Sequence, residues 1–100
     1  MSPPLPIDDR SAALYTVGQV ANMLGVPPAY LRRLDTEGLV RPARSDGGQR
    51  RYSRDEIAQV QRVNALVAEG LTLAGIRRLL VLEAQLAEVR RELEEERSRR

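Results

Sequence analysis

The chain has 100 residues, which is enough for one domain with a modest core and an extension that cannot fold alone. It contains no cysteine and no histidine, so disulfides are excluded and the usual zinc ligands and nucleophile–base pairs are missing. We therefore expect no catalytic, metal or cofactor site. Because no apolar run approaches a membrane span or a signal-peptide core, we also expect a cytoplasmic protein with no membrane contact.

The net charge of +2 conceals two regions of opposite sign. Residues 28–54 carry seven arginines against three acidic residues, about +4, whereas residues 83–97 carry six glutamates against three arginines, about −3. All 16 basic residues are arginine, for which a GC-rich genome is a sufficient cause. A basic stretch followed by an acidic one nevertheless indicates a nucleic-acid surface and a separate protein-facing element.

Residues 1–13 are rich in proline, serine and aspartate and lack apolar periodicity, so we expect a flexible arm there. The first helix begins at Thr16, which forms a capping-box pattern with Gln19, and it ends at Gly25. Its inward face consists of Val17, Val20, Ala21 and Leu24.

The second helix opens at Pro27-Pro28, because proline is accepted where the backbone N–H has no helical partner. Leu31 and Leu34 point inward, and Gly38 closes the helix. This arrangement leaves Tyr30, Arg32 and Arg33 free to face outward near the helix N-terminus, where recognition helices meet base edges. The two helices together predict a helix-turn-helix, although Tyr30 suits helix packing equally well.

Residues 39–52 predict a β-hairpin wing, with two short strands around an Asp-Gly-Gly turn. Pro42 cannot donate a ladder hydrogen bond, so the first strand should lie at a sheet edge. Five arginines cluster around the wing, namely Arg41, Arg44, Arg50, Arg51 and Arg54. Guanidinium groups suit phosphate, which positions a protein on a duplex without reading its sequence. Tyr52 either packs the base of the wing or donates to a phosphate.

A second capping box, Ser53 with Glu56, begins the third helix, and Thr72 caps the fourth. The hinge between these helices is expected at Glu69-Gly70. The inward stripe of the third helix is Ile57, Val60, Val63 and Val67, and that of the fourth is Leu73, Ile76, Leu79 and Leu80.

Apolar residues at alternating spacings of three and four then form a heptad seam, Leu79, Leu82, Leu86, Val89 and Leu93. About two heptads are marginal as a lone helix, so the seam predicts a partner, of which a second copy of the chain is the simplest. The alternative is that the same residues cap the protein's own helix bundle. The polar residues 98–100 should fray.

Four stretches follow one another in a characteristic order and spacing, namely YTVGQVANMLGV, LRRLDTEGLVRPAR, GGQRRYS and EGLTLAGIRRLL. In this order and spacing the chain resembles the MerR family of bacterial transcription regulators, and the nearest branch is the heat-shock repressors of the HspR type. The resemblance covers residues 14–82. It implies a mainly α fold in which residues 14–82 form a winged helix-turn-helix DNA-binding domain with a small β-hairpin wing. It also implies a dimerisation helix at 83–97 that pairs as an antiparallel coiled coil.

Carried over residue by residue, the resemblance and the basic pattern predict DNA contacts at Thr16, Tyr30, Arg32, Arg33, Arg44, Gln49, Arg50, Arg51 and Tyr52. The same comparison predicts a dimer interface at Leu79, Leu82, Leu86, Val89 and Leu93. Two departures alter the pattern. Arg33 and Leu34 stand where the family often has two aromatics, and Pro27 replaces the usual capping hydroxyl.

The predicted function is a homodimeric, sequence-specific DNA-binding repressor that acts on inverted-repeat operators, of chaperone or stress genes by resemblance. The sequence has neither the cysteines nor the added domain of metal- or drug-sensing members, so no small-molecule ligand is expected. By resemblance, the DnaK chaperone is the leading co-repressor partner. The alternatives are an activator that distorts promoter DNA and, in another class, a helix-mediated protein-binding adaptor. Carboxylates at Asp8-Asp9 and residues 94–96 lie in the termini without a pocket, so an enzyme is not predicted.

Overall fold

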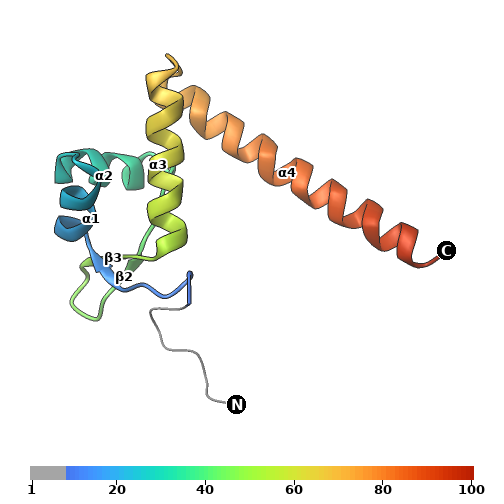
Figure 1. Ribbon diagram of the computed structural model, residues 1–100, viewed down its shortest axis with the longest axis horizontal. Coiled ribbons are helices and arrows are strands. Elements are labelled where there is room, and N and C mark those ends of the chain that lie inside the picture. Colours follow the sequence, from blue (N-terminus) through green and yellow to red (C-terminus); the bar gives the residue numbers. More distant parts are fainter. Residues whose placement is uncertain (1–8) are drawn as a thin grey trace.

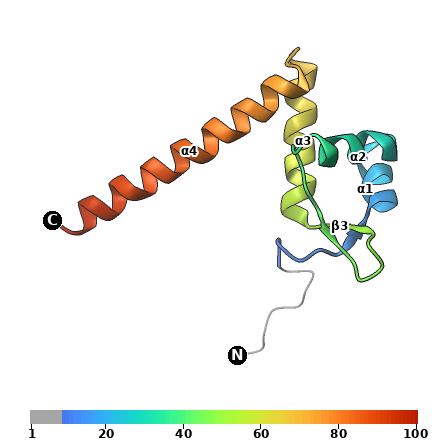
Figure 2. The ribbon, with the colours of Figure 1, turned by 180° about the vertical axis from the view of Figure 1, so that it is seen from behind.

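The structure is a computed structural model that describes residues 9–100. In chain order its elements are β1 (Tyr15–Thr16), α1 (Val17–Leu24), α2 (Pro28–Thr36), β2 (Ala43–Arg44), β3 (Arg50–Tyr52), α3 (Arg54–Ala68) and α4 (Leu73–Ser98). The elements β1 to α3 form a head, residues 14–72, from which the long α4 projects (Figures 1 and 2). The predicted fold class, mainly α with a small wing and a long C-terminal helix, is confirmed.

Three helices begin at the predicted capping residues. The Thr16 hydroxyl accepts from the Gln19 N–H at 3.1 Å while the Gln19 side chain accepts from the Thr16 N–H at 2.8 Å. Ser53 and Glu56 make the same reciprocal pair at 3.1 and 2.8 Å. Thr72 Oγ1 accepts from the N–H of Gly75 at 3.0 Å. Each pair satisfies backbone donors that the first helical turn leaves without partners.

The sheet has three antiparallel strands in the order β1-β3-β2, so β2 lies at an edge, as Pro42 predicted. Arg44 lies opposite Arg50 across the wing, and Tyr15 lies opposite Tyr52. Strand β1 was not predicted. It joins the base of the wing directly to α1, because Thr16 is both a strand residue and the N-cap of α1.

The core gathers residues from every helix and from the central strand. Its largest fully buried side chains are Val20, Leu31, Leu34, Tyr52, Val60, Val63 and Ile76. One predicted inward residue is wrong, because Val67 is 41% exposed whereas Leu66 packs against the core. The last turn of α3 lies beside the start of α4, so its inward direction is set by α4, where Leu73 packs on the same core.

Helix α4 has 26 residues, about 39 Å at 1.5 Å per residue. Its first turns pack on the head through buried Ile76 and through Leu73 and Leu80. Arg62 of α3 and Glu83 of α4 form an ion pair at 2.6 Å. Every residue beyond Glu83 is exposed, so α4 leaves the head at this point (Figure 1).

Of the predicted flexible arm, residues 1–13, residues 1–8 lie outside the described residues. Arg10 of its described part runs beside the start of α3. The Asp55 N–H donates to the Arg10 carbonyl at 3.0 Å, and the Arg10 side chain pairs with that of Asp55 at 2.9 Å. Both side chains are more than half exposed, so the ion pair contributes little to stability.

Candidate nucleic-acid interface

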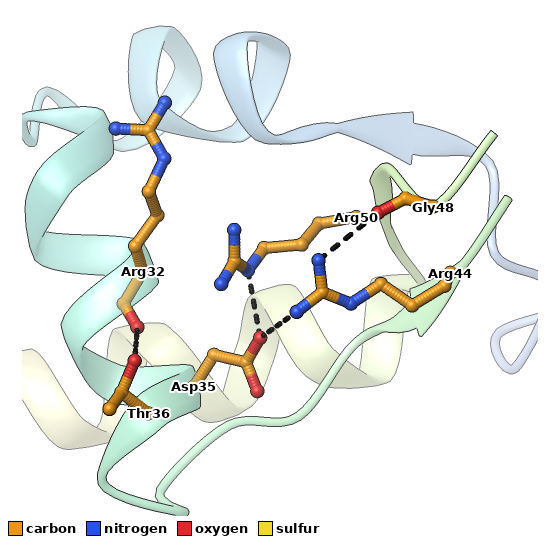
Figure 3. A network of polar contacts seen from close by, with 6 residues as sticks. All are labelled: Arg32, Asp35, Thr36, Arg44, Gly48 and Arg50. Atoms are coloured by element: carbon orange, nitrogen blue, oxygen red, sulfur yellow. Dashed lines mark hydrogen bonds and ion pairs between the residues drawn. The ribbon is translucent and has the colours of Figure 1, made fainter.

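Helix α2 presents its arginines to solvent because two leucines fix its rotation. Leu31 and Leu34 are fully buried, which leaves Arg32 and Arg33 on the opposite, exposed side. Arg33 Nε lies 3.3 Å from a carboxylate oxygen of Glu37, one turn later. The Arg32 guanidinium has no ion pair within residues 9–100, and it points away from Asp35 (Figure 3). Of the two exposed α2 arginines, Arg32 is therefore the one that no carboxylate of residues 9–100 engages.

A single carboxylate joins α2 to both strands of the wing. Asp35 Oδ2 accepts from Arg50 Nε at 2.8 Å and from Arg44 Nη2 at 3.2 Å (Figure 3). Arg44 also donates through Nη1 to the Gly48 carbonyl at 3.2 Å, which links the network to the wing turn. The side chains of Asp35 and Arg50 are 15% and 19% exposed, so this pair is well shielded from solvent.

A shallow hollow of about 340 Å³ lies between α2, the start of α1 and the wing. It is lined by Thr16, Val17, Arg32, Arg44, Gly48, Gln49, Arg50 and Arg51. Six of the nine predicted DNA contacts, Thr16, Arg32, Arg44, Gln49, Arg50 and Arg51, therefore line one surface. The lining contains four arginines and no acidic residue, a composition that favours an anion such as phosphate.

Two of the predicted contacts are packed into the head instead. Tyr52 has no exposed surface, so it cannot touch DNA in this conformation and is removed from the predicted contacts. Tyr30 packs against the core, and its hydroxyl donates to Asn64 Oδ1 at 2.7 Å, which joins α2 to α3. Burial raises the pKa of both tyrosines above the ordinary value. For both residues the packing alternative agrees with the structure.

Two residues that the sequence did not single out organise this surface. Asp35 was counted among the three acids of the basic stretch, and its one signal was the resemblance of LRRLDTEGLV to a recognition helix with an aspartate at its end. Arg77, at the start of α4, donates to the Glu37 carbonyl at 3.2 Å. Glu37 is the C-cap of α2, so this bond ties the projecting helix to the end of α2.

The heptad seam lies on the exposed part of α4. Leu82, Leu86, Val89 and Leu93 are 49–58% exposed, whereas Leu79 is half-buried at the edge of the head. No described part of the chain covers these four side chains, so the alternative in which they cap the protein's own bundle is wrong. Such a row of apolar side chains on a projecting helix is typical of a surface for another helix.

Other kinds of site find no support in residues 9–100. That part of the chain holds no cluster of three or more acidic, histidine or cysteine side chains arranged for a metal ion. None of its helices is long and apolar enough to cross a membrane.

Comparison with known proteins shows the family to which the chain belongs. The family described as MerR HTH family regulatory protein matches residues 15–82. The chain is 42% identical over 77 residues to a putative heat shock protein HspR of Streptomyces coelicolor, covering 76% of this chain and 51% of the relative. It is 28% identical over 81 residues to the HTH-type transcriptional regulator GlnR of Bacillus anthracis, covering 81% of this chain and 63% of the relative. The chain thus spans between half and two thirds of these two proteins.

Two solved structures share the fold over most of both chains. HiNmlR, a MerR family regulator lacking the sensor domain and bound to promoter DNA, is 25% identical with a TM-score of 0.62, covering 80% of this chain and 82% of that one. MtaN, the N-terminus of the Bacillus subtilis multidrug transporter activator, is 28% identical with a TM-score of 0.64, covering 85% and 86%. The matches are regulators and not enzymes, as predicted, and the predicted resemblance is confirmed. The chain belongs to the MerR family of helix-turn-helix regulatory proteins.

Proposed function

We propose that this DNA-binding regulator acts as a homodimeric, sequence-specific repressor of the HspR type. The observation that carries the proposal is the arginine-lined hollow, which gathers six predicted DNA contacts from three parts of the chain. The 42% identity to a putative heat shock protein HspR supports that branch of the family. The structural likeness to a MerR family regulator bound to promoter DNA supports the duplex as the ligand.

In this proposal α2 enters the major groove and the wing follows the backbone. Arg32 lies near the N-terminal half of α2, the part of a recognition helix that reaches base edges. An exposed guanidinium there suits bidentate pairing with guanine. Arg44, Gln49, Arg50 and Arg51 contact phosphates, and Arg33 contributes from its exposed position beside Glu37.

The dimer forms through the seam on α4, with a second copy as the partner. Charge along α4 favours an antiparallel arrangement. Residues 73–82 carry two arginines and no acid, whereas residues 83–97 carry six glutamates against three arginines. Antiparallel pairing places the basic part of each helix beside the acidic part of its partner, whereas parallel pairing places the two acidic parts together.

A second candidate function is activation of a promoter. It is favoured by the structural likeness to MtaN, the N-terminus of a transporter activator, at a TM-score of 0.64. The same dimer and the same DNA contacts serve either sign of regulation. The two functions are distinguished by the position of the operator relative to the promoter elements.

The test is capture of genomic DNA fragments by the purified full chain, with and without DnaK, followed by sequencing. Retention of inverted repeats near chaperone genes, strengthened by DnaK, is the expected result. Strong retention of other promoters without any effect of DnaK overturns the chaperone partnership. Absence of enrichment overturns DNA recognition and favours a protein-binding adaptor. An Arg32→Ala chain is the matched control, because it keeps the wing and should lose the sequence preference.

A further inference from the structure

We infer that Asp35 is a positioning residue that fixes the register between the recognition helix and the wing, and so the distance between the base contact and the phosphate contacts. The inference rests on the proposed function, because it concerns how the same surface selects its sequence. The Asp35 carboxylate points toward Arg44 and Arg50 of the wing (Figure 3), so it acts through these two arginines.

The geometry gives Asp35 a central place. One oxygen, Oδ2, accepts from β3 through Arg50 at 2.8 Å and from β2 through Arg44 at 3.2 Å. Arg44 continues to the Gly48 carbonyl at 3.2 Å. Two hydrogen bonds therefore connect α2 to the two wing strands, and a third links this network to the turn between them.

Burial separates this pair from the other ion pairs of residues 9–100. Asp35 and Arg50 are 15% and 19% exposed, whereas the side chains of the pairs that do not involve Asp35 are 36–70% exposed. An exposed pair contributes little, because water and salt screen it and its long side chains are costly to order. A shielded pair holds its geometry, and loss of one partner leaves the other charge without compensation.

The donors also divide between the two tasks. Asp35 takes Nε of Arg50 and one terminal nitrogen of Arg44, and each guanidinium has five N–H donors. Arg44 uses one further donor for the Gly48 carbonyl, and the other donors of both arginines are available to the hollow, which both residues line. Asp35 therefore fixes the positions of the Arg44 and Arg50 guanidinium groups, which are proposed to bind phosphate, and its carboxylate cancels one of their two positive charges.

This arrangement gives the loss of Asp35 two opposite consequences. Asp35→Asn makes the DNA-facing surface more positive by one charge, which should raise affinity for any duplex. The same change releases Arg44 and Arg50 from α2, which should lower affinity for the operator relative to other sequences. A residue that contributed only charge would change both affinities in the same direction.

The experiment compares Asp35→Asn in the 100-residue chain with Asp46→Asn, a control that removes the same charge from an exposed position on the wing turn. Dissociation constants are measured for the captured operator and for a random duplex at two salt concentrations. For Asp35→Asn we expect the ratio of specific to non-specific affinity to fall about tenfold, the effect of one mismatched base pair, with non-specific affinity equal or higher. For Asp46→Asn the ratio should stay within about twofold. A ratio that is unchanged in Asp35→Asn, or that falls equally in both variants, overturns the inference.

Circular dichroism and thermal unfolding verify that each variant is folded. If Asp35→Asn does not fold, Asp35→Glu is measured instead, because it keeps the negative charge on a longer side chain. Its ratio of specific to non-specific affinity should be lower than that of the wild-type chain, and an unchanged ratio overturns the inference. If the wild-type chain itself does not distinguish the operator, the proposed function fails by itself. The connection between α2 and the wing is then tested by a double-mutant cycle, in which the free energy of unfolding is measured for Asp35→Asn, Arg50→Gln and the two changes together. Non-additive effects support the link between α2 and the wing, and additive effects overturn it.

Discussion

Leu86 lies at the middle of the heptad seam, so its truncation tests the proposed dimer most directly. The side chain is 49% exposed in the single chain, so about half of its burial is still to be gained. Burying a whole leucine side chain is worth about 1.5–3 kcal/mol, which leaves about 0.8–1.5 kcal/mol for each copy. Both copies lose this contact in Leu86→Ala, so the dimer should weaken by about 1.5–3 kcal/mol, roughly 10- to 100-fold in its dissociation constant.

Sedimentation equilibrium over a wide concentration range measures this constant for the full chain. Val81→Ala is the matched control, because Val81 is 52% exposed on the same helix but lies outside the seam. It should leave the dissociation constant within about threefold, below 1 kcal/mol. The reasoning is refuted if the wild-type chain is monomeric at every concentration, or if both variants weaken the dimer equally. Circular dichroism verifies that α4 remains helical in both.

Three further predictions concern the head and the packing of α4 on it. Arg32→Ala should reduce discrimination at one operator position by about 1–3 kcal/mol, measured on a panel of single-base variants; an equal loss on every variant would make Arg32 a phosphate contact. Ile76→Ala removes a fully buried side chain that joins α4 to the core, so chemical denaturation should show the free energy of unfolding lowered by about 2–5 kcal/mol. A loss below about 1 kcal/mol would contradict the packing of α4 on the head. Tyr52→Phe should leave stability at pH 7 equal or higher, because the buried hydroxyl has no hydrogen-bond partner within residues 9–100. Burial raises the folded-state pKa of the Tyr52 hydroxyl above the unfolded value of about 10. Below the unfolded value the ionisation of this hydroxyl costs no stability, and the free energy of unfolding then falls as the pH rises through the folded value, because the unfolded chain loses this proton first. Thermal unfolding from neutral to alkaline pH should therefore show a smaller alkaline loss for Tyr52→Phe, and an equal loss would contradict this assignment.

The sequence predicted those features whose partners lie close along the chain. The capping boxes at Thr16 and Ser53 each involve a residue three positions away, so the local pattern contains the whole interaction. The turn of the wing and the exposed side of α2 follow from equally local patterns. The family resemblance then supplied the arrangement of these pieces in space.

Features that depend on distant partners were not predicted. Strand β1 has two residues, too few to show alternation, and it forms only because Tyr52, 37 positions later, lies beside Tyr15. Asp35 acquires its role from Arg50, 15 positions away, once the wing folds back on α2. For Val67 the helical period was right, but the neighbour of α3 changes at its last turn.

The joint between α4 and the head connects the two surfaces on which the proposed function depends. Arg77 ties the start of α4 to the C-cap of α2 at 3.2 Å, and the Arg62–Glu83 pair ties the next turns to α3 at 2.6 Å. The direction of the seam is therefore set relative to the recognition helix. In an antiparallel dimer the two heads lie at opposite ends of paired helices about 39 Å long, comparable with the 34–36 Å between half-sites one turn apart. Which bases are read then depends on α2 and the wing, whereas the spacing of the half-sites depends on this joint.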